Sequence, residues 1–379
     1  MSGNTHAKAL HQSEFAGVFL VTGGGVTLLA ELLSEPGASR TVLEASVPYA
    51  EAALTEQLGG QPDQACSEDT ARALAMAAFQ RAVILNAEQQ DYKKQHLIGF
   101  GCTAALATNR KKRGAHRAYL AVQTLTTTAT AIVEFDKGPD GMGDRKSEED
   151  QVTDLAWRLL DETLDVRLGA PALVPSSQAT LRQATAKTAW SQLLAHEISS
   201  TSNQPDAARP SALLSGSFNP LHAGHLQMAQ HASQVLDTDV AFEICIDNVD
   251  KPALGYVDLH ERNSQFEKNV LWLTNLPTFI EKAREFPNCT FIVGIDTLVR
   301  IGMPRYYENV DAMNASFAEY TSLGTRFLVF GRNDSHGFQT LATSEVPDAL
   351  AALCTNVTED DFRVDLSSTE LRNEEHQNS

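Results

Sequence analysis

From Ser211 onward, short apolar runs that end in glycine or polar residues alternate with helical segments. Strand-like runs cover residues 211–214, 240–246, 290–293 and 326–330, and helical patterns cover residues 225–235 and 259–273. Regular alternation of strands and helices predicts a parallel, doubly wound sheet. Ligands on such sheets lie at the carboxyl ends of the strands, where residues 216–224, 294–296 and 331–332 are expected to form loops.

The N-terminal half also follows an order of strand, glycine turn and helix. An apolar run at residues 16–21 ends in Thr22-Gly23-Gly24-Gly25, and residues 26–33 read as a helix. Further helices are expected at residues 67–85 and 152–164, strands at 96–100, 118–124 and 131–135, and an exposed loop at 137–149. This half is therefore expected to be α/β as well.

A change of composition between the two halves predicts a domain boundary. The chain has 379 residues, which suggests two domains at roughly 100–200 residues each. The polar run at residues 199–210 has the composition of a linker, and a helix is expected at about residues 184–198. We therefore predict an N-terminal domain over 1–170, a linker with a helix over 171–210, and a C-terminal domain over 211–379.

Bulk composition narrows the class of protein. The net charge of −18 argues against a general nucleic-acid binder, which would show a basic face. Five dispersed cysteines without a CxxC pair favour a reducing compartment over a disulfide framework or a zinc site. We expect no secretory signal, because residues 1–14 are polar, and no apolar run reaches the roughly 18 residues that span a bilayer. We expect a soluble cytoplasmic protein that binds neither nucleic acid nor membrane.

The string from Gly216 to His225, Gly-Ser-Phe-Asn-Pro-Leu-His-Ala-Gly-His, is the strongest local signal. Its glycines allow close turns, its proline stiffens the loop, and His222 and His225 stand three apart around a helix start. Residues at this spacing face the same side of a helix. Helix N-termini also attract anions through free N–H groups and the helix dipole. The string therefore predicts a phosphate-binding site.

A second signal follows near the C-terminus, in Leu366-Ser367-Ser368-Thr369-Glu370-Leu371-Arg372. Serine and threonine cap helices and offer hydroxyl and amide donors. Arg372 lies one turn further on and can contact two phosphate oxygens at once. Seen alone, each motif could be structural, as a histidine pair or a plain helix cap. Together they predict one pocket that surrounds a triphosphate.

These two strings resemble the HxGH and SSTxxR-type signatures of the nucleotidyltransferase superfamily, which includes nicotinamide and nicotinate mononucleotide adenylyltransferases and small cytidylyltransferases. Gly294-Ile295-Asp296 also resembles the Gly-x-Asp segment of the pyridine-nucleotide members. The resemblance covers about residues 212–372 and implies a Rossmann-like doubly wound domain. It implies transfer of a nucleotidyl group from a triphosphate, ATP or another, to a phosphorylated small molecule, with release of pyrophosphate.

The same resemblance implies residue roles. His222 and His225 would contact the triphosphate and stabilise charge at the α-phosphorus, and Arg372 would hold the distal phosphates. The implied nucleotide-binding set is Gly216, Ser217, Phe218, Asn219, Gly224, Asp296, Ser367, Ser368 and Thr369. Lys251 and Arg300 are weak candidates for the acceptor side, and Arg332 for a nucleotide contact. Magnesium is expected to accompany the triphosphate, held by phosphate oxygens and water rather than by a protein metal site.

The N-terminal half resembles, more weakly, the C-terminal domain of the CinA family, whose members are nicotinamide-nucleotide amidases. The resemblance runs over about residues 16–124 through Thr22-Gly23-Gly24, Glu35-Pro36-Gly37-Ala38-Ser39 and Tyr49. The family's reactive serine falls at Leu20 and its lysine near Leu54. Without a nucleophile and a base, acyl transfer cannot start, although Thr22 is a remote substitute. We expect an amidase-like but inactive domain that could still bind a nucleotide or self-associate.

We expect the whole chain to transfer AMP to nicotinamide or nicotinate mononucleotide. One alternative is cytidylyl or adenylyl transfer to another phosphate ester, such as a lipid head group or phosphopantetheine. A second is a non-catalytic nucleotide sensor or scaffold, and a third is a working bifunctional amidase–transferase. Fusion to an amidase-like domain is associational, so the acceptor stays open.

Overall fold

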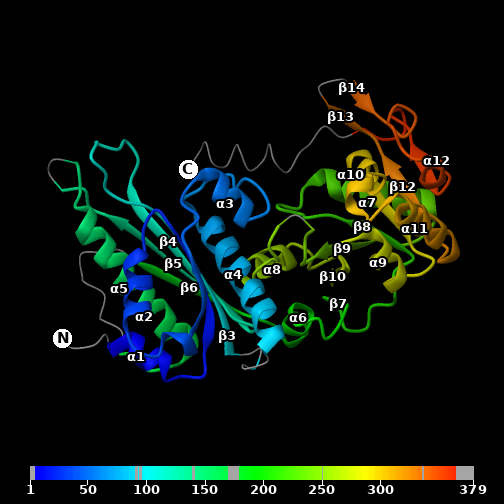
Figure 1. The fold of residues 1–379 in the computed structure, drawn as a ribbon. Helices are drawn as coiled ribbons and strands as arrows, with labels where there is room; N and C mark the ends of the chain where they lie inside the picture. The colour runs from blue at the N-terminus through cyan, green and yellow to red at the C-terminus, as the bar shows by residue number, and fades with distance from the viewer. Residues whose placement is uncertain are drawn as a thin grey trace. The chain divides into compact units, whose positions relative to one another are not determined.

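The computed structural model describes residues 5–89, 93, 96–138, 141–169, 179–249, 251–334 and 337–363. The chain forms two compact units (Figure 1). The first unit comprises Met1–Ala195 together with Asp250–His260, and the second comprises His196–Val249 and Glu261–Ser379. No helix among the described residues has the length and apolar character needed to cross a membrane.

The first unit is built on a six-stranded mixed sheet in the order β2-β1-β3-β4-β5-β6. Strand β1 runs parallel to β2 and β3, whereas β3, β4, β5 and β6 are antiparallel in succession. The elements are α1 (Thr5–His11), β1 (Ala16–Thr22), α2 (Val26–Ser34), β2 (Val42–Ser46), α3 (Glu51–Gln57), α4 (Glu68–Gln89), β3 (Leu97–Ala105), β4 (His116–Gln123), β5 (Thr127–Phe135), α5 (Arg145–Leu164), β6 (Thr180–Thr185) and α6 (Thr188–Leu194). The expected α/β fold of this half is confirmed.

Helices cover both faces of this sheet (Figure 1). Helices α2 and α5 pack on one face, in a core that includes Phe19, Phe100 and Trp157. Helix α4 packs on the other face, where β3 presents glycine at alternate positions. A Cβ on Gly99 would lie 2.1 Å from the carbonyl oxygen of Ala75, and one on Gly101 would lie 2.4 Å from that of Ala71. These glycines therefore allow α4 to lie directly against the strand.

The segment expected as an exposed loop at residues 137–149 is partly helical, and that expectation was wrong. Helix α5 begins at Arg145, because Asp144 caps it by accepting hydrogen bonds from the backbone N–H groups of Lys146 and Ser147. Glu148 and Glu149 are buried in its first turns. Their charge made the segment look solvated, but each carboxylate accepts hydrogen bonds from other parts of the first unit.

The second unit is built on a seven-stranded sheet in the order β15-β12-β11-β8-β9-β10-β7. All neighbours are parallel except β7, which pairs with β10 antiparallel. The elements are β7 (Ser200–Ser202), β8 (Ala212–Ser215), α7 (Ala223–Leu236), β9 (Ala241–Cys245), β10 (Leu271–Thr274), α9 (Phe279–Glu285), β11 (Thr290–Gly294), α10 (Ile295–Ile301), α11 (Val310–Ser322), β12 (Arg326–Phe330), β13 (Arg332–Asp334), β14 (Gly337–Gln339), α12 (Asp348–Ala351) and β15 (Cys354–Val357). Helix α8 (Tyr256–Ser264) spans the division between the units, which falls after His260.

The order of the six parallel strands confirms the expected doubly wound fold. Counted from β8, the chain builds outward through β9 and β10, then returns to place β11, β12 and β15 on the other side of β8. This is the order 3-2-1-4-5-6 of Rossmann-type sheets, whose topological switch point lies between the first and fourth strands. Here that point lies between the carboxyl ends of β8 and β11.

The helix expected at residues 259–273 is shorter than expected. Helix α8 ends at Ser264, and residues 271–274 form the buried strand β10. Leu271, Trp272 and Leu273 are consecutive apolar residues, a run that suits a strand covered on both faces better than a helix. Parallel pairing with β9 and antiparallel pairing with β7 satisfy the backbone of β10.

The segment 171–210 contains more structure than a helix and a polar run. Its described residues include β6 and α6 in the first unit and β7 in the second. Strand β7 closes the edge of the second sheet, where Ser202 pairs with Trp272.

Candidate nucleotide site in the second unit

The loop between β8 and α7, residues 216–222, lies at the switch point of the second sheet. Its first residue, Gly216, donates a backbone hydrogen bond to the carbonyl oxygen of Glu243 on β9, at 3.0 Å. On the other side of β8, strand β11 ends at Gly294. Because these parallel strands end at the same edge of the sheet, the two loops that follow them share the crevice where Rossmann-type sheets bind ligands.

Phe218 anchors this loop. Its ring is 1% exposed and makes edge contacts with His225, Phe242 and Phe266 at centroid distances of 4.9, 5.5 and 5.3 Å. A Cβ on Gly216 would lie 2.8 Å from the same ring, so only glycine fits beneath it. Phe218 has a φ of 44°, a left-handed conformation that costs a non-glycine residue roughly 1–2 kcal/mol. Burial of the ring offsets that cost and fixes the path of the loop.

Gln265 braces the same loop from just beyond α8. Its Oε1 accepts a hydrogen bond from the backbone N–H of Leu221 at 2.7 Å, and its Nε2 donates to the carbonyl oxygen of Phe218 at 3.3 Å. Arg262 adds a hydrogen bond from Nη1 to the carbonyl oxygen of Ser217 at 2.9 Å. The loop conformation is therefore held by side chains more than forty residues further along the chain.

We expect Gln265→Leu to lower the turnover number about tenfold. The variant loses the hydrogen bonds to the N–H of Leu221 and the carbonyl oxygen of Phe218, so the loop is no longer held in position. Steady-state kinetics of nucleotidyl transfer measure this effect. Gln265→Glu is the matched control, because it keeps the acceptor for Leu221 but loses the donor to Phe218. Its turnover should fall between that of wild type and that of Gln265→Leu. A Gln265→Leu protein with wild-type turnover would rule out a positioning role.

His222 and His225 lie together at the start of α7. His222 is the residue before the helix, and its ring stacks on that of His225 at a centroid distance of 3.8 Å. The backbone N–H of His222 donates to Nδ1 of His225 at 3.3 Å. Since Nδ1 of His225 accepts this bond, the proton of its neutral ring is on Nε2. The fold thus gives His225 a fixed N–H donor.

Burial keeps both imidazoles neutral. Desolvation, together with a smaller contribution from the neighbouring His222, lowers the pKa of His225 from 6.5 to about 4. Desolvation also lowers the pKa of His222. Burial and the proximity of the second ring both disfavour a positive charge on either imidazole, as long as no anion is bound beside them. At neutral pH the pair therefore acts through N–H groups, not through a standing charge.

Unpartnered polar atoms gather where the loop begins and ends. Ser215 Oγ, at the end of β8, and His222 Nδ1 are buried without a hydrogen-bond partner among the described residues. Gly224 is buried in the first turn of α7. Buried polar atoms are nearly always hydrogen-bonded in complete structures. Those two atoms therefore favour a polar ligand at this end of the sheet.

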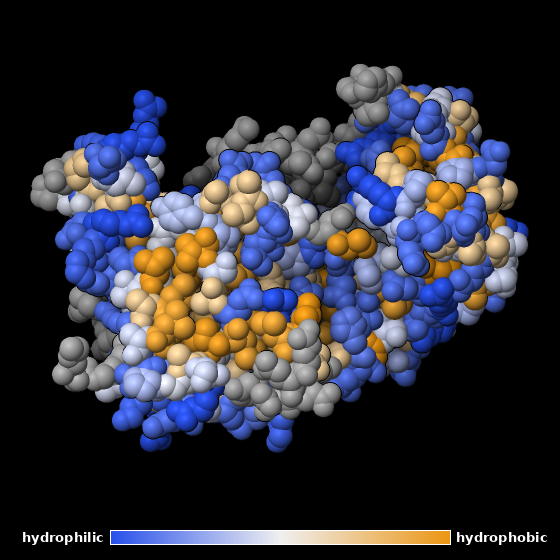
Figure 2. Space-filling view, in the orientation of Figure 1, coloured by the Kyte–Doolittle hydropathy of each residue, from blue (hydrophilic) through white to orange (hydrophobic). Residues whose placement is uncertain are grey.

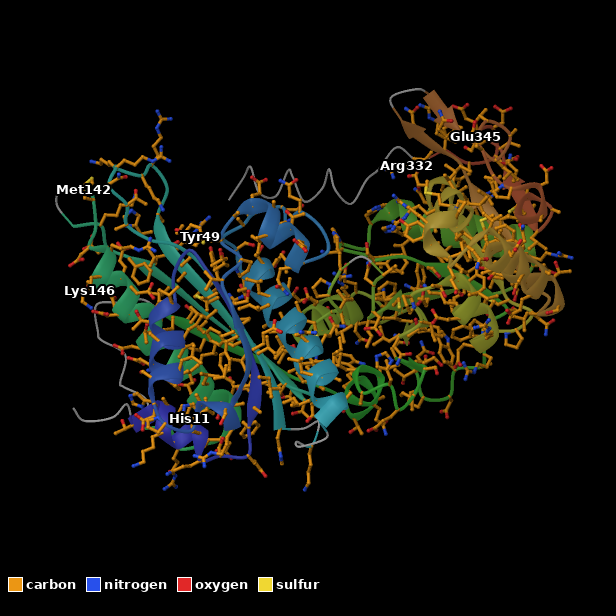
Figure 3. All side chains as sticks on the ribbon, in the orientation of Figure 1. His11, Tyr49, Met142, Lys146, Arg332 and Glu345 are labelled. Atoms are coloured by element: carbon orange, nitrogen blue, oxygen red, sulfur yellow. The ribbon has the colours of Figure 1, made fainter. Side chains whose placement is uncertain are left out.

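Asp296 lies in the first turn of α10, directly after β11. Its Oδ2 pairs with Nη1 of Arg332 at 2.7 Å, and both side chains are more than half exposed. Arg332 (labelled in Figure 3) follows β12, so the pair joins the ends of two adjacent strands. The sequence predicts them only as separate candidates for nucleotide contacts. The structure brings them into one ion pair at the ligand-binding edge.

The other expected site residues have different positions. Arg300, on α10, contacts Tyr306 through a 3.3 Å hydrogen bond and a cation–π contact. Lys251 is exposed in the segment 250–260, which is part of the first unit. Ser367, Ser368, Thr369 and Arg372 lie outside the described residues, so their roles stay predictions. The described chain ends near Phe362, whose ring contacts His231 on α7 and Phe330 on β12.

Three residues of this region were missed from the sequence. Gln265 and Arg262 carry no motif, and a lone polar residue near a helix end gives no signal of a distant contact. Asp247, two residues after β9, has a buried Oδ1 without a partner among the described residues and lies 3.5 Å from His196. Burial raises the pKa of this carboxyl group. A carboxylate just past a buried strand was the only sequence signal for it.

Within the described ranges, no group of three or more histidine, cysteine or acidic side chains is placed to hold a metal ion. The imidazoles, the guanidinium and the backbone amides of this region suit phosphate oxygens rather than a divalent cation. The carboxylate of Asp296 pairs with Arg332, so a magnesium ion would be held mainly by the phosphates.

Together, the strand order, the glycine loop and the helix that starts at paired imidazoles define a domain of the Rossmann type. Residues 213–374, less than half of the chain, match the family model described as cytidylyltransferase-like. This part of the chain is a cytidylyltransferase-like domain, and the match supports nucleotidyl transfer as the class of its activity. Among curated proteins, none matches the chain.

Solved structures from the CinA superfamily match the N-terminal part. A superfamily protein from Escherichia coli is 15% identical, covers 42% of this chain and 87% of its own, and gives a TM-score of 0.31. A superfamily protein from Enterobacter cloacae is 16% identical, with 42% and 88% covered and a TM-score of 0.31. The competence/damage inducible protein CihA from Agrobacterium tumefaciens is 16% identical, with 45% and 98% covered and a TM-score of 0.29. Likeness at this level says nothing about activity.

The first unit lacks a reactive group at the positions that the amidase resemblance highlights. Leu20 is fully buried in β1, and Leu54 is buried on α3. Tyr49 (labelled in Figure 3) is 66% exposed. At the glycine turn, the Glu149 carboxylate accepts hydrogen bonds from the backbone N–H groups of Gly25 and Thr27, at 3.0 and 2.9 Å. A carboxylate of the chain itself thus occupies the anion position at the start of α2.

We expect Leu20→Ser not to produce an amidase, because the new hydroxyl would be buried in a strand with no lysine beside it. The measurement is ammonia release from nicotinamide mononucleotide by the purified variant. The double variant Leu20→Ser/Leu54→Lys is the companion test, since it restores both missing groups. Ammonia release by the single variant would contradict this prediction.

Proposed function

We propose that the second unit transfers AMP from ATP to nicotinamide or nicotinate mononucleotide and releases pyrophosphate. The loop from Gly216 to His225 supports this choice, since its sequence resembles the pyridine-nucleotide members of the superfamily. The amidase-like character of the first unit points to the same class of acceptor.

One observation carries the proposal: a fixed N–H donor lies at the switch point of a Rossmann-type sheet. His225 Nε2 bears its proton because Nδ1 is engaged by the backbone of His222. The start of α7, a 14-residue helix, lies at the same place and favours negative charge. A triphosphate that enters this crevice therefore meets donors held in position before it binds.

The reaction needs positioning and charge stabilisation rather than a general base. An oxygen of the acceptor's phosphate attacks the α-phosphorus, the bond between the α-phosphorus and its bridging oxygen breaks, and pyrophosphate leaves. Negative charge grows on the α-phosphate oxygens as this happens. His225 Nε2–H and His222 donate to those oxygens, and preorganised donors of this kind are worth most where charge develops.

The serine-rich turn would hold the leaving pyrophosphate. The described chain ends at Arg363, four positions before Ser367. Phe362 contacts His231, which is on the same helix as His225. The chain that leads to the second motif is therefore in contact with α7, which supports the proposal that both motifs serve one site. Magnesium, when bound with the triphosphate, would shield negative charge that Arg372 also offsets and that the imidazole N–H groups stabilise by hydrogen bonding.

A second candidate is cytidylyl transfer to another phosphate ester, which the cytidylyltransferase-like match favours. Both candidates use the same phosphate chemistry and differ in the base and the acceptor. A non-catalytic scaffold is disfavoured because a drifting site would be expected to lose some of His222, His225 and Arg372, and this chain retains all three.

Pyrophosphate release by the full-length protein separates these candidates. ATP and CTP are each combined with nicotinamide mononucleotide, nicotinate mononucleotide, phosphopantetheine and a phosphorylated head group such as phosphocholine. The proposal predicts release with ATP and a pyridine mononucleotide. Release only with CTP and a different acceptor would establish the second candidate. Nucleotide binding without release on any acceptor would leave a scaffold.

A further inference from the structure

A cavity of about 480 Å³ opens on the first unit at the loop between β3 and β4. Its size falls within the range of small-molecule pockets, roughly 300–1,000 Å³. Three of its eight lining residues are alanine or glycine, and no acidic residue is among the eight. The other five are cationic: Arg110, Lys111, Lys112, Arg113 and Arg117. Polar side chains gather at this end of the unit in Figure 2.

This concentration of positive charge is unusual in a chain whose net charge is −18. Within the part of the chain that the structure describes, none of the five cations forms an ion pair. Other surface cations of the unit do: Arg81 pairs with Glu44 at 2.9 Å, and Arg158 pairs with Glu162 at 2.7 Å. Five cations around one cavity therefore repel one another without a counterion.

The nearby buried carboxylate is already engaged. Glu148 Oε1 lies 2.7 Å from His116 Nδ1, and its Oε2 accepts a hydrogen bond from the backbone N–H of Ala107 at 2.6 Å. Its side chain is 3% exposed, so it faces the interior. Its negative charge favours the charged form of Lys112, but it forms no ion pair with any of the five cations, all of which the structure describes.

Further cations hold the backbone of the loop in place. Lys137 donates to the carbonyl oxygens of Lys112, at 3.0 Å, and Gly114. Arg145 donates to the carbonyl oxygen of Ala107 at 3.4 Å. A cavity wall that is tied down before a ligand arrives loses less entropy on binding.

Lys112 has a lowered pKa in this environment. Desolvation lowers the pKa of its ammonium group, and the positive charges of Arg145 and Arg110 lower it further. Its Nζ donates to the carbonyl oxygen of Leu106 at 2.7 Å, which keeps the side chain within the loop. An anion in the cavity would reverse the effect of the neighbouring cations.

We propose that this cavity binds a small polyphosphate anion, either inorganic pyrophosphate or the triphosphate of a nucleotide. A single phosphate carries at most about two negative charges near neutral pH, which five cations exceed. A diphosphate or triphosphate carries more charge over several oxygens, and arginine guanidinium groups contact such oxygens in pairs. The site belongs to the first unit alone and does not depend on the function proposed for the second.

Titration calorimetry of the full-length protein in magnesium-free buffer tests the proposal. Pyrophosphate, ATP and orthophosphate are compared on wild type and on Lys111→Gln/Arg113→Gln. The matched control, Arg81→Gln/Arg158→Gln, removes the same charge from the same unit away from the cavity. Lys111→Arg/Arg113→Lys keeps the charge, and melting without ligand checks that every variant is folded.

The Lys111→Gln/Arg113→Gln protein should lose one class of pyrophosphate site or bind at that site at least tenfold more weakly. The control and the charge-keeping variant should bind like wild type, and orthophosphate should bind at least tenfold more weakly than pyrophosphate. Weaker ATP but unchanged pyrophosphate binding would assign the site to a nucleotide triphosphate. A folded Lys111→Gln/Arg113→Gln protein that titrates like wild type with both polyphosphates would overturn the proposal. Equal affinity for orthophosphate would overturn the polyphosphate class.

Discussion

Replacing His225 by alanine should lower the turnover number roughly 100- to 1,000-fold, while the dissociation constant for ATP rises much less. The reason is that its Nε2–H is aimed at charge that appears only as the α-phosphorus is attacked. Groups that act mainly on the transition state affect turnover more than binding. Rapid-quench or steady-state assays of pyrophosphate release, with ATP binding measured separately, give both numbers.

Two controls make this prediction specific. His225→Gln can place an amide N–H near the lost Nε2–H, so it should recover part of the turnover. His6→Ala removes an imidazole from the first unit and should leave turnover unchanged. Because the pKa of His225 is lowered to about 4, the ring stays neutral through the neutral range, and turnover should show no acid limb near 6.5 from this residue. Wild-type turnover in His225→Ala would remove His225 from the chemistry.

Phe218→Ala should reduce the free energy of unfolding of the second unit by about 3–5 kcal/mol, the usual cost of emptying a buried phenylalanine site. The turnover number should fall as well. The ring of Phe218 holds the residue's own backbone at a φ of 44°, and it lies against His225. Denaturant unfolding followed by a probe in the second unit measures the stability change. Turnover is then measured under conditions where the variant remains folded.

Phe266→Ala is the matched control, because Phe266 belongs to the same aromatic cluster but not to the loop. It should cost a similar free energy of unfolding while keeping much more of the turnover. Phe218→Leu, which keeps most of the volume, should cost less than about 1.5 kcal/mol. If Phe218→Ala and Phe266→Ala retained the same turnover when folded, Phe218 would be a core residue and no more.

The sequence was informative where local pattern and tertiary environment agree. Strand β12 begins at Arg326 and ends at Phe330 as expected, because a short apolar run between polar turns is typical of a buried strand. His222 and His225 come together for a local reason, since residues three apart at a helix start share a face. The doubly wound order of the second sheet also followed from the alternation of strands and helices.

What the sequence could not provide depends on contacts between distant residues. Gln265 braces Leu221 from 44 positions away, and no local pattern encodes that bond. Because Glu149 is charged, it was expected to be exposed to solvent. It is a buried residue of α5, and its carboxylate accepts hydrogen bonds from backbone N–H groups at the start of α2. Residues 271–273 were expected in a helix, since the pairing of β10 with two neighbouring strands is a property of the sheet and not of the local sequence. The basic cavity likewise arises only when the loop folds back on itself.

The most direct test of the central claim is a crystal structure of the full-length protein with magnesium and a non-hydrolysable ATP analogue. The measured quantity is the distance from His225 Nε2 to the nearest α-phosphate oxygen. We predict hydrogen-bond distance, with Arg372 and the Ser367–Thr369 turn on the distal phosphates of the same molecule. A triphosphate bound elsewhere on the second unit, or contacts from only one of the two motifs, would contradict the account.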